Sequence, residues 1–167
     1  MNTTLAIQDT KRRITTLSPS GVEEIGEALR DLLADVYALY VKTKGFHWHV
    51  SGPHFPDYHR LLDDQATQIL SMVDPIAERA RKLGAPSLQS IGEIAERQRL
   101  HDSEGNARVA EDMLAVLLYD NQELTGYLRS VHEVCARHLD VATASLIENW
   151  IDESEMRTWF LYAILQQ

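Results

Sequence analysis

The segment 44-KGFHWHVSGPHFPDYHRLLDD-64 decides how the 167-residue chain is interpreted, because it joins two helical patterns and concentrates imidazole groups. It contains four of the seven histidines of the chain, His47, His49, His54 and His59. One helical pattern ends at its Gly52-Pro53 pair, and a second begins directly afterwards. If the chain reverses direction at this pair, His47 and His59 come close together.

Apolar residues recur at spacings of three and four on both sides of this segment, which is typical of amphipathic helices. Ser20 is the expected N-cap of the first helix, with Glu23 completing a capping box. Gly84 followed by Pro86 predicts the end of the second helix, and Asp140 is the expected N-cap of the last. The helices are expected from about 20 to 52, and over 55–83, 91–98, 103–137 and 140–165. Four long helices and one short one predict an all-α four-helix bundle.

The division of the chain follows from the same pattern. Residues 1–18 carry no sustained apolar period and are expected to form a mobile N-terminal arm. Residues 19–167 are expected to form one bundle domain, a size that allows a real hydrophobic core.

The composition argues against membrane insertion, an internal disulfide and non-specific nucleic-acid binding. The longest apolar run, at 113–118, is too short to span a bilayer, and the N-terminus lacks the apolar core of a signal peptide, so we expect a cytoplasmic protein without membrane contact. The single cysteine, Cys135, excludes an internal disulfide and is expected to be a small buried side chain. The net charge of −9 disfavours non-specific nucleic-acid binding and favours cations.

Four metal-binding side chains of the predicted second helix, His59, Asp63, Asp74 and Glu78, share a stripe about 100° wide. His59 and Asp74 are about 22 Å apart along the axis, so one metal ion cannot contact both pairs within one chain. Both pairs, His59 with Glu78 and Asp63 with Asp74, have their midpoint between residues 68 and 69. An antiparallel contact with a second copy would therefore bring them together at two equivalent sites. Solvated charges on an amphipathic helix are the alternative.

The donor types also indicate which metal such a site would take. Imidazole together with carboxylates suits iron, zinc or manganese. No glutamate is followed three residues later by a histidine, which disfavours a di-iron site inside the bundle.

Two segments, HWHVSGPHFPDYHRLLD (47–63) and VDPIAERARKLGAP (73–86), closely resemble the signatures of the Dps family, the DNA-protection-during-starvation miniferritins. The resemblance implies a ferritin-like four-helix bundle with a short extra helix between helices two and three, and a shell of typically twelve subunits. It implies a two-iron-type ferroxidase centre at each two-fold interface, with Trp48 beside it. Its ligands would be His47, His59 and Asp63 of one chain with Asp74 and Glu78 of the next.

The same resemblance implies an activity. Iron(II) would be oxidised, preferentially by hydrogen peroxide, and stored inside the shell as ferric mineral, which protects the cell from oxidative damage. Other divalent metals such as zinc could take the place of iron. His49 and His54 are not family ligands, and Lys44 is a candidate partner of a ligand carboxylate.

Two alternatives have less support. A nucleoid-associated DNA-binding protein, with iron oxidation secondary, is supported by Lys11, Arg12 and Arg13 of the arm, against a net charge of −9. We therefore expect DNA binding to be weak or absent. A helical scaffold without metal chemistry leaves both matched segments unexplained. The last helix contributes either an acidic iron entry path or a solvated face, through Glu148, Asp152 and Glu155.

Overall fold

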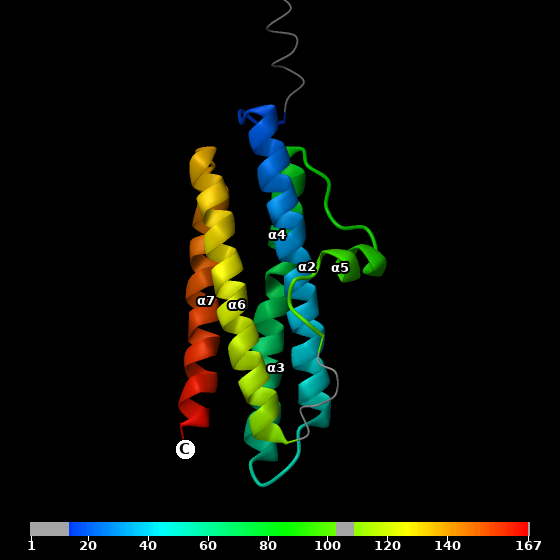
Figure 1. The fold of residues 1–167 in the computed structure, drawn as a ribbon, viewed down its shortest axis with the longest axis vertical. Helices are drawn as coiled ribbons and strands as arrows, with labels where there is room; N and C mark the ends of the chain where they lie inside the picture. The colour runs from blue at the N-terminus through cyan, green and yellow to red at the C-terminus, as the bar shows by residue number, and fades with distance from the viewer. Residues whose placement is uncertain (1–13, 103–108, 167) are drawn as a thin grey trace, which may run out of the picture.

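The computed structural model describes residues 14–102 and 109–166, and every regular element in these two ranges is an α-helix. This confirms the predicted all-α class. Four rods run side by side, and the short helix α5 lies outside them, beside α2 (Figure 1). The rods are formed by α2 (Pro19–His49), by α3 (Phe55–Ser71) continued in α4 (Val73–Leu83), by α6 (Ala110–Arg137) and by α7 (Val141–Leu165); α5 is Ile91–Arg97.

The helix α2 begins earlier than predicted. Its N-cap is Ser18, whose hydroxyl accepts a hydrogen bond from the Gly21 N–H at 3.1 Å, so the prediction of a Ser20 cap was wrong. Pro19 explains the difference, because its fixed φ suits the first helical position and its missing N–H costs nothing there.

The predicted second helix, 55–83, is divided at Met72 into α3 and α4. Pro75 is the physical cause, because it has no N–H for the carbonyl of Ser71 and its ring crowds that carbonyl. Met72 keeps right-handed helical angles (φ −78°, ψ −22°), so α3 and α4 follow one another along the same rod (Figure 1).

Three other predicted boundaries are confirmed. Gly84 ends α4 in the left-handed conformation at φ 89°. Asp140 caps α7 by accepting from the Thr143 N–H at 3.1 Å. The short helix α5 lies where predicted, capped by Ser90.

Two predictions fall partly outside the described residues. The start of the third helix at 103 does so, because α6 begins at Ala110 and residues 103–108 are not described. The arm predicted at 1–18, with Lys11, Arg12 and Arg13, has residues 1–13 outside them, so the division into arm and domain stays a prediction.

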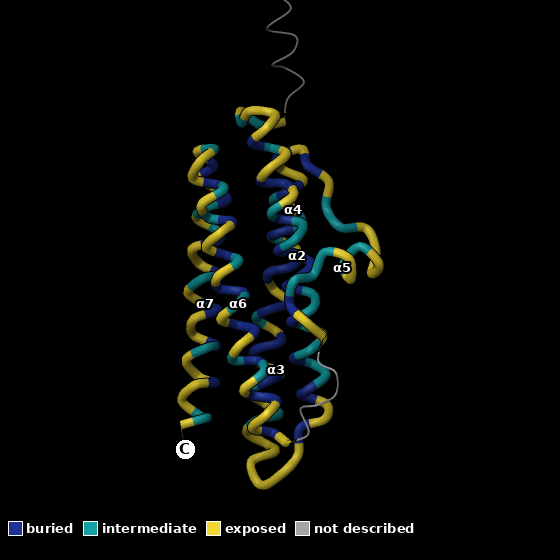
Figure 2. Tube along the Cα trace, viewed as in Figure 1, coloured by how far each residue is buried: buried dark blue, intermediate teal, exposed yellow. Residues whose placement is uncertain are grey.

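The hydrophobic core lies between the rods, along the inward faces that Figure 2 colours as buried. It includes Cys135, which is fully buried as expected. No helix in the described residues is long and apolar enough to cross a membrane. The residues of α2 at the centre of this core are Ile25, Leu29, Leu32, Val36 and Leu39.

The segment after α5 is fastened to the bundle by two buried carboxylates. Asp35 of α2 accepts from the backbone N–H of Arg99 at 2.5 Å, from its Nε at 2.8 Å and from its Nη2 at 2.6 Å. Asp120 of α6 pairs at 2.6 Å with Lys42 of α2, whose Nζ also donates to the carbonyl oxygen of His101 at 2.5 Å. These contacts fix α5 against α2 although α5 has no buried residue of its own.

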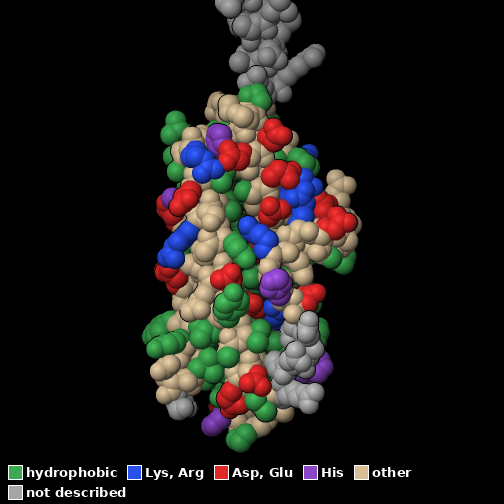
Figure 3. Space-filling model, viewed as in Figure 1, with side chains coloured by type: hydrophobic (Ala, Val, Ile, Leu, Met, Phe, Trp, Pro, Cys, Tyr) green, Lys and Arg blue, Asp and Glu red, His purple; other side chains and the backbone are tan. Residues whose placement is uncertain are grey.

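The surface is uneven in character. Charged side chains of both signs are mixed over much of the visible face, and apolar side chains gather over the lower parts of α6 and α7 (Figure 3). Four aromatic residues of these helices are exposed: Tyr119, Trp159, Phe160 and Tyr162.

Candidate metal centre

His47 and His59 lie against each other where the chain reverses between α2 and α3. Their rings are stacked, with centroids 3.7 Å apart and planes inclined by 22°. The Nδ1 of His47 lies 2.8 Å from the carbonyl oxygen of His59, and the Nδ1 of His59 lies 2.9 Å from the carbonyl oxygen of His47. The pair is thus fixed by two reciprocal hydrogen bonds to the backbone.

This arrangement decides which ring nitrogen is available to a metal. A carbonyl oxygen can only accept, so each Nδ1 must carry a proton and donate it. In a neutral imidazole the Nε2 then holds the lone pair, which is the state a metal ligand needs. Both rings are therefore preset to bind a cation through Nε2.

Asp63 lies one helical turn after His59 and stands close to the same pair. Its Oδ1 is 3.9 Å from the Nε2 of His47 and 2.7 Å from the Nζ of Lys44. The hydrogen bond from Lys44, followed by the charge of Lys44, lowers the pKa of the Asp63 carboxyl. Asp63 therefore stays ionised beside the imidazole nitrogens, and Lys44 is the carboxylate partner that the sequence indicated.

Asp74 and Glu78 lie elsewhere in the same chain. Both are exposed on α4, and Glu78 contacts only Lys82 of its own helix, at 3.2 Å, among the hydrogen bonds found. In the part of the chain that the structure describes, no group of three or more histidine, cysteine, aspartate or glutamate side chains is close enough to hold a metal ion. Within the described ranges, one chain thus places His47, His59 and Asp63 at the same turn without forming a complete metal site by itself, and it leaves the other two predicted ligands apart.

The remaining residues of the segment differ in their surroundings. Trp48 is 66% exposed, with the Nζ of Lys44 6.0 Å from its ring. His49 turns back to the carbonyl oxygen of Gly45 at 2.7 Å, and the His54 ring lies 5.7 Å from that of Tyr58.

Sequence reasoning missed one contributor, Phe55, whose ring lies 5.0 Å from that of His59. Its spacing of four residues before His59 on one helix was the available signal.

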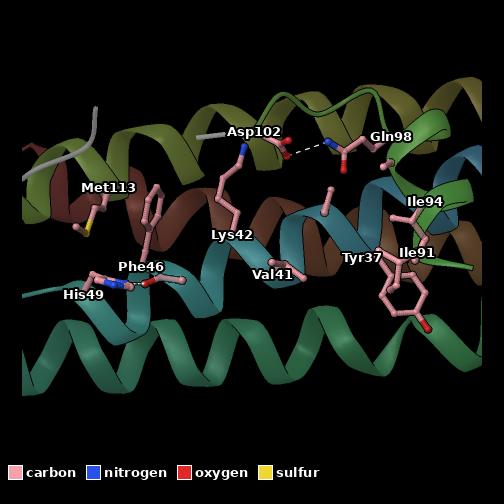
Figure 4. A pocket seen from close by; sticks show the side chains of 13 residues that line it. Tyr37, Val41, Lys42, Phe46, His49, Ile91, Ile94, Gln98, Asp102 and Met113 are labelled. Carbon is pink, nitrogen blue, oxygen red and sulfur yellow. Dashed lines mark hydrogen bonds between the residues drawn. The ribbon is translucent and has the colours of Figure 1, made fainter. Parts of the chain in front are cut away.

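Apart from the histidine-containing turn, a hollow of about 780 Å³ lies between α2 and α5 (Figure 4). Its walls are mainly apolar, with Val41, Phe46, Ile91 and Ile94 among them. Its charged or titratable side chains include Lys42, His49 and Asp102, and Asp102 accepts from the Nε2 of Gln98 at 2.9 Å. The groove offers no imidazole–carboxylate pair like that of His47 and Asp63.

The predicted acidic residues of α7 include two with basic partners. Glu148 lies 3.0 Å from the Nε2 of His132, and Glu155 pairs with Arg129. Their use as an iron entry path stays a prediction.

Known proteins resemble this chain in sequence over most of its length. The model of the ferritin-like domain matches residues 26–167. A low-temperature-induced protein of Nostoc sp. is 33% identical over 135 residues, covering 80% of this chain and 75% of that protein. The DNA protection during starvation protein 2 of Bacillus anthracis is 27% identical, covering 87% of this chain and 99% of that protein.

A solved structure extends the agreement to the fold. The Dps protein from Bacillus brevis superimposes with a TM-score of 0.85 at 26% identity, covering 89% of this chain and 99% of that one. The helical order, the histidine-containing turn and these similarities lead to one conclusion: the chain belongs to the Dps family of ferritin-like proteins.

Proposed function

We propose that the protein is a ferroxidase and iron store that oxidises iron(II), preferentially with hydrogen peroxide, at centres shared between two subunits of a shell of twelve. The observation that supports this most directly is the stacked His47–His59 pair, whose Nδ1 atoms are held by carbonyl oxygens and whose Nε2 atoms are left for a metal. Asp63 adds an ionised carboxylate beside them.

The proposed centre is completed by a second copy of the chain. The Asp63 side chain is 54% exposed and that of Glu78 is 67% exposed, so both carboxylates are accessible to a neighbouring molecule. Leu70, 43% exposed and close to the midpoint of the two pairs, offers apolar contact there. An antiparallel crossing at residues 68–69 would bring the partner's Asp74 and the partner's Glu78 to the histidines of the first chain.

The proposed reaction balances without a radical product. Two iron(II) ions bound at neighbouring ligands give up one electron each, and hydrogen peroxide with two protons becomes two molecules of water. Because both electrons arrive together, the O–O bond is cleaved without release of hydroxyl radical. The acidic chain, with its net charge of −9, attracts the cationic substrate.

The test is anaerobic loading with iron(II) followed by peroxide, with the particle mass measured on the same sample. We expect His47→Ala combined with His59→Ala to abolish fast oxidation and to retain the assembly, because apolar packing stabilises the bundle. The matched control is His49→Ala combined with His54→Ala, which removes two imidazoles of the same turn and should leave the rate unchanged. An unaltered rate in the first variant would refute the ligand assignment.

Sharing of the centre between chains has its own test. Subunits carrying His59→Ala and Asp63→Ala are mixed, unfolded and reassembled with subunits carrying Asp74→Ala and Glu78→Ala. In a hybrid pair one centre loses all four groups and the other keeps them, so part of the oxidation rate should return. If co-assembled mixtures recover no activity, the centre does not combine residues of two chains in this way.

A further inference from the structure

A buried arginine of α7 lies against α6 inside the bundle. Arg157 is 1% exposed, and its Nε donates to the Oδ1 of Asn121 at 2.8 Å. Its Nη1 and Nη2 are buried and have no hydrogen-bond partner among the described residues. Two charged amino groups are thus enclosed without an acceptor.

Gln65 of α3 also has buried polar atoms without a hydrogen-bond partner in the described part of the chain, at the same level along the bundle axis. It is 3% exposed, and neither its Nε2 nor its Oε1 has a partner among the residues that the structure describes. We call Gln65, Asn121 and Arg157 the mid-bundle layer.

The register of the antiparallel helices places Gln65 level with Arg157. At one end of the rods, the Nε of Arg79 donates to the Oγ1 of Thr143 at 2.7 Å. At the other end, Tyr58 and Ile164 line one small hollow. Gln65 lies 14 residues before Arg79, and Arg157 lies 14 residues after Thr143. Likewise, Gln65 lies seven residues after Tyr58, and Arg157 lies seven residues before Ile164. The two residues are therefore level on the antiparallel rods.

The chemistry of the layer calls for an acceptor that also carries negative charge. A guanidinium group has N–H donors and no acceptor, so a group facing Nη1 and Nη2 must accept hydrogen bonds. Burial lowers the pKa of Arg157 to about 10, opposed by the charge of Glu153, so the group is still a cation at neutral pH. A water molecule would accept these hydrogen bonds but would add no charge, and Glu153, whose charge acts on Arg157, forms no ion pair with it among the described residues, so the burial of the cation stays costly.

The neighbouring hydroxyl groups are already engaged. The hydroxyls of Thr125 and Ser154 donate to the carbonyl oxygen of Asn121 at 2.8 and 3.1 Å. Asn121 Oδ1 is taken by Arg157 Nε, which leaves the amide group of Gln65 as the other free member of the layer.

We propose that the mid-bundle layer binds a small monovalent anion of the halide class, held by the Nη1 and Nη2 groups of Arg157 with the amide N–H of Gln65 as a further donor. The anion neutralises the buried guanidinium and ties α3 to α6 and α7.

The first test is thermal unfolding of the assembled protein at constant ionic strength, with sodium gluconate replaced stepwise by sodium chloride or bromide. Because the anion binds only the folded state, the Tm should rise with halide and then level off, by about 2–4 °C. Arg157→Met should abolish this dependence. The control Arg129→Met, which removes an exposed arginine paired with Glu155, should retain it.

The second test does not depend on a variant that folds. Crystals of the unaltered protein grown in bromide should show an anomalous peak within hydrogen-bonding distance of Arg157 Nη1 or Nη2. A layer without bromide in these crystals, occupied by water or by nothing, overturns the proposal. So does a halide response that is absent from the unaltered protein or that is equal in Arg157→Met.

Discussion

The pairing of His47 with His59 rests on backbone acceptors rather than on other side chains. Each ring is held by the carbonyl oxygen of the other residue, and the two rings stack at 3.7 Å. This fixes the ring positions without a metal, so metal binding would not have to order these two proposed ligands. Asp63 differs, because its Oδ1 is held by the ammonium group of the Lys44 side chain and not by the backbone.

The Lys44–Asp63 pair gives a prediction for proton binding. Lys44 lowers the pKa of Asp63 by hydrogen bonding and by its charge, so Lys44→Met should raise that pKa toward its ordinary value. The favourable contribution of the pair is present above the unfolded-state pKa of Asp63 and is lost as pH falls through its lower folded-state pKa. Carboxyl carbon-13 NMR of the metal-free protein measures the shift.

The control for that titration is Lys82→Met. This change removes a lysine that pairs with Glu78 on the same rod and should leave the titration of Asp63 unaltered. An Asp63 pKa that stays low in Lys44→Met would mean that the neighbouring imidazoles, and not Lys44, set it.

Much of this residue-level detail was beyond prediction from sequence. Chain reversal at Gly52-Pro53 was sufficient to predict that His47 and His59 approach each other. The stacking and the choice of Nδ1 as donor depend on side-chain rotamers, which no spacing encodes, whereas the contact of Phe55 with His59 follows a spacing of four that was overlooked. The buried Nη1 and Nη2 groups of Arg157 were not predicted, because a single arginine in a helical sequence is usually on the exposed face.

At the level of the helices, sequence predicted the elements well and their junctions less well. Gly84 and Asp140 were correctly assigned because a left-handed glycine and an N-cap aspartate act locally. The Ser20 cap and the unbroken second helix were wrong because prolines at 19 and 75 were given too little weight. The ion pair between Asp35 and Arg99 joins residues 64 positions apart, so no local sequence pattern predicts it.

Loss of the Asp35–Arg99 ion pair should lower the free energy of unfolding substantially. Asp35 is fully buried, so Asp35→Asn leaves the Arg99 guanidinium with a poorer acceptor and should lower the free energy of unfolding by about 3 kcal/mol. The backbone N–H groups of Arg99 and Leu100 should lose protection from hydrogen exchange, because both donate to Asp35.

Asp31→Asn is the matched control for this prediction. Asp31 is on the same helix and pairs with Arg97, but its side chain is 36% exposed, so the loss should stay below about 1 kcal/mol. Equal effects of the two substitutions would show that burial does not distinguish these pairs.

At the scale of the whole molecule, the exposed aromatic residues of α6 and α7 are the candidate contact surface for the proposed assembly. Contiguous exposed apolar surface commonly marks an interaction site, and Trp159 and Phe160 lie with ring centroids 5.0 Å apart. We predict that Trp159→Lys combined with Phe160→Lys lowers the particle mass in light scattering. Val141→Lys, at the other end of α7, should not. An unchanged mass in the double variant would exclude this patch from the assembly contacts.

Binding to DNA is the other property decided by the whole assembly. Affinity for the phosphate backbone grows with the number of phosphates neutralised, and the arm offers three cations per chain, Lys11, Arg12 and Arg13. Several arms on one shell add avidity only where they reach one duplex together. The net charge of −9 on every chain acts against them.

We therefore predict weak, strongly salt-dependent DNA binding that disappears near an ionic strength of about 0.15 M, where the screening length is about 8 Å. At lower salt, where screening is weaker, the few arm cations act over a longer distance and complexes should form. A gel-shift titration across salt concentrations, with the full chain and with residues 1–15 deleted, measures the salt dependence of binding and the contribution of the arm. Complexes that persist at about 0.15 M salt and vanish with the deletion would show that the arm outweighs the acidic body.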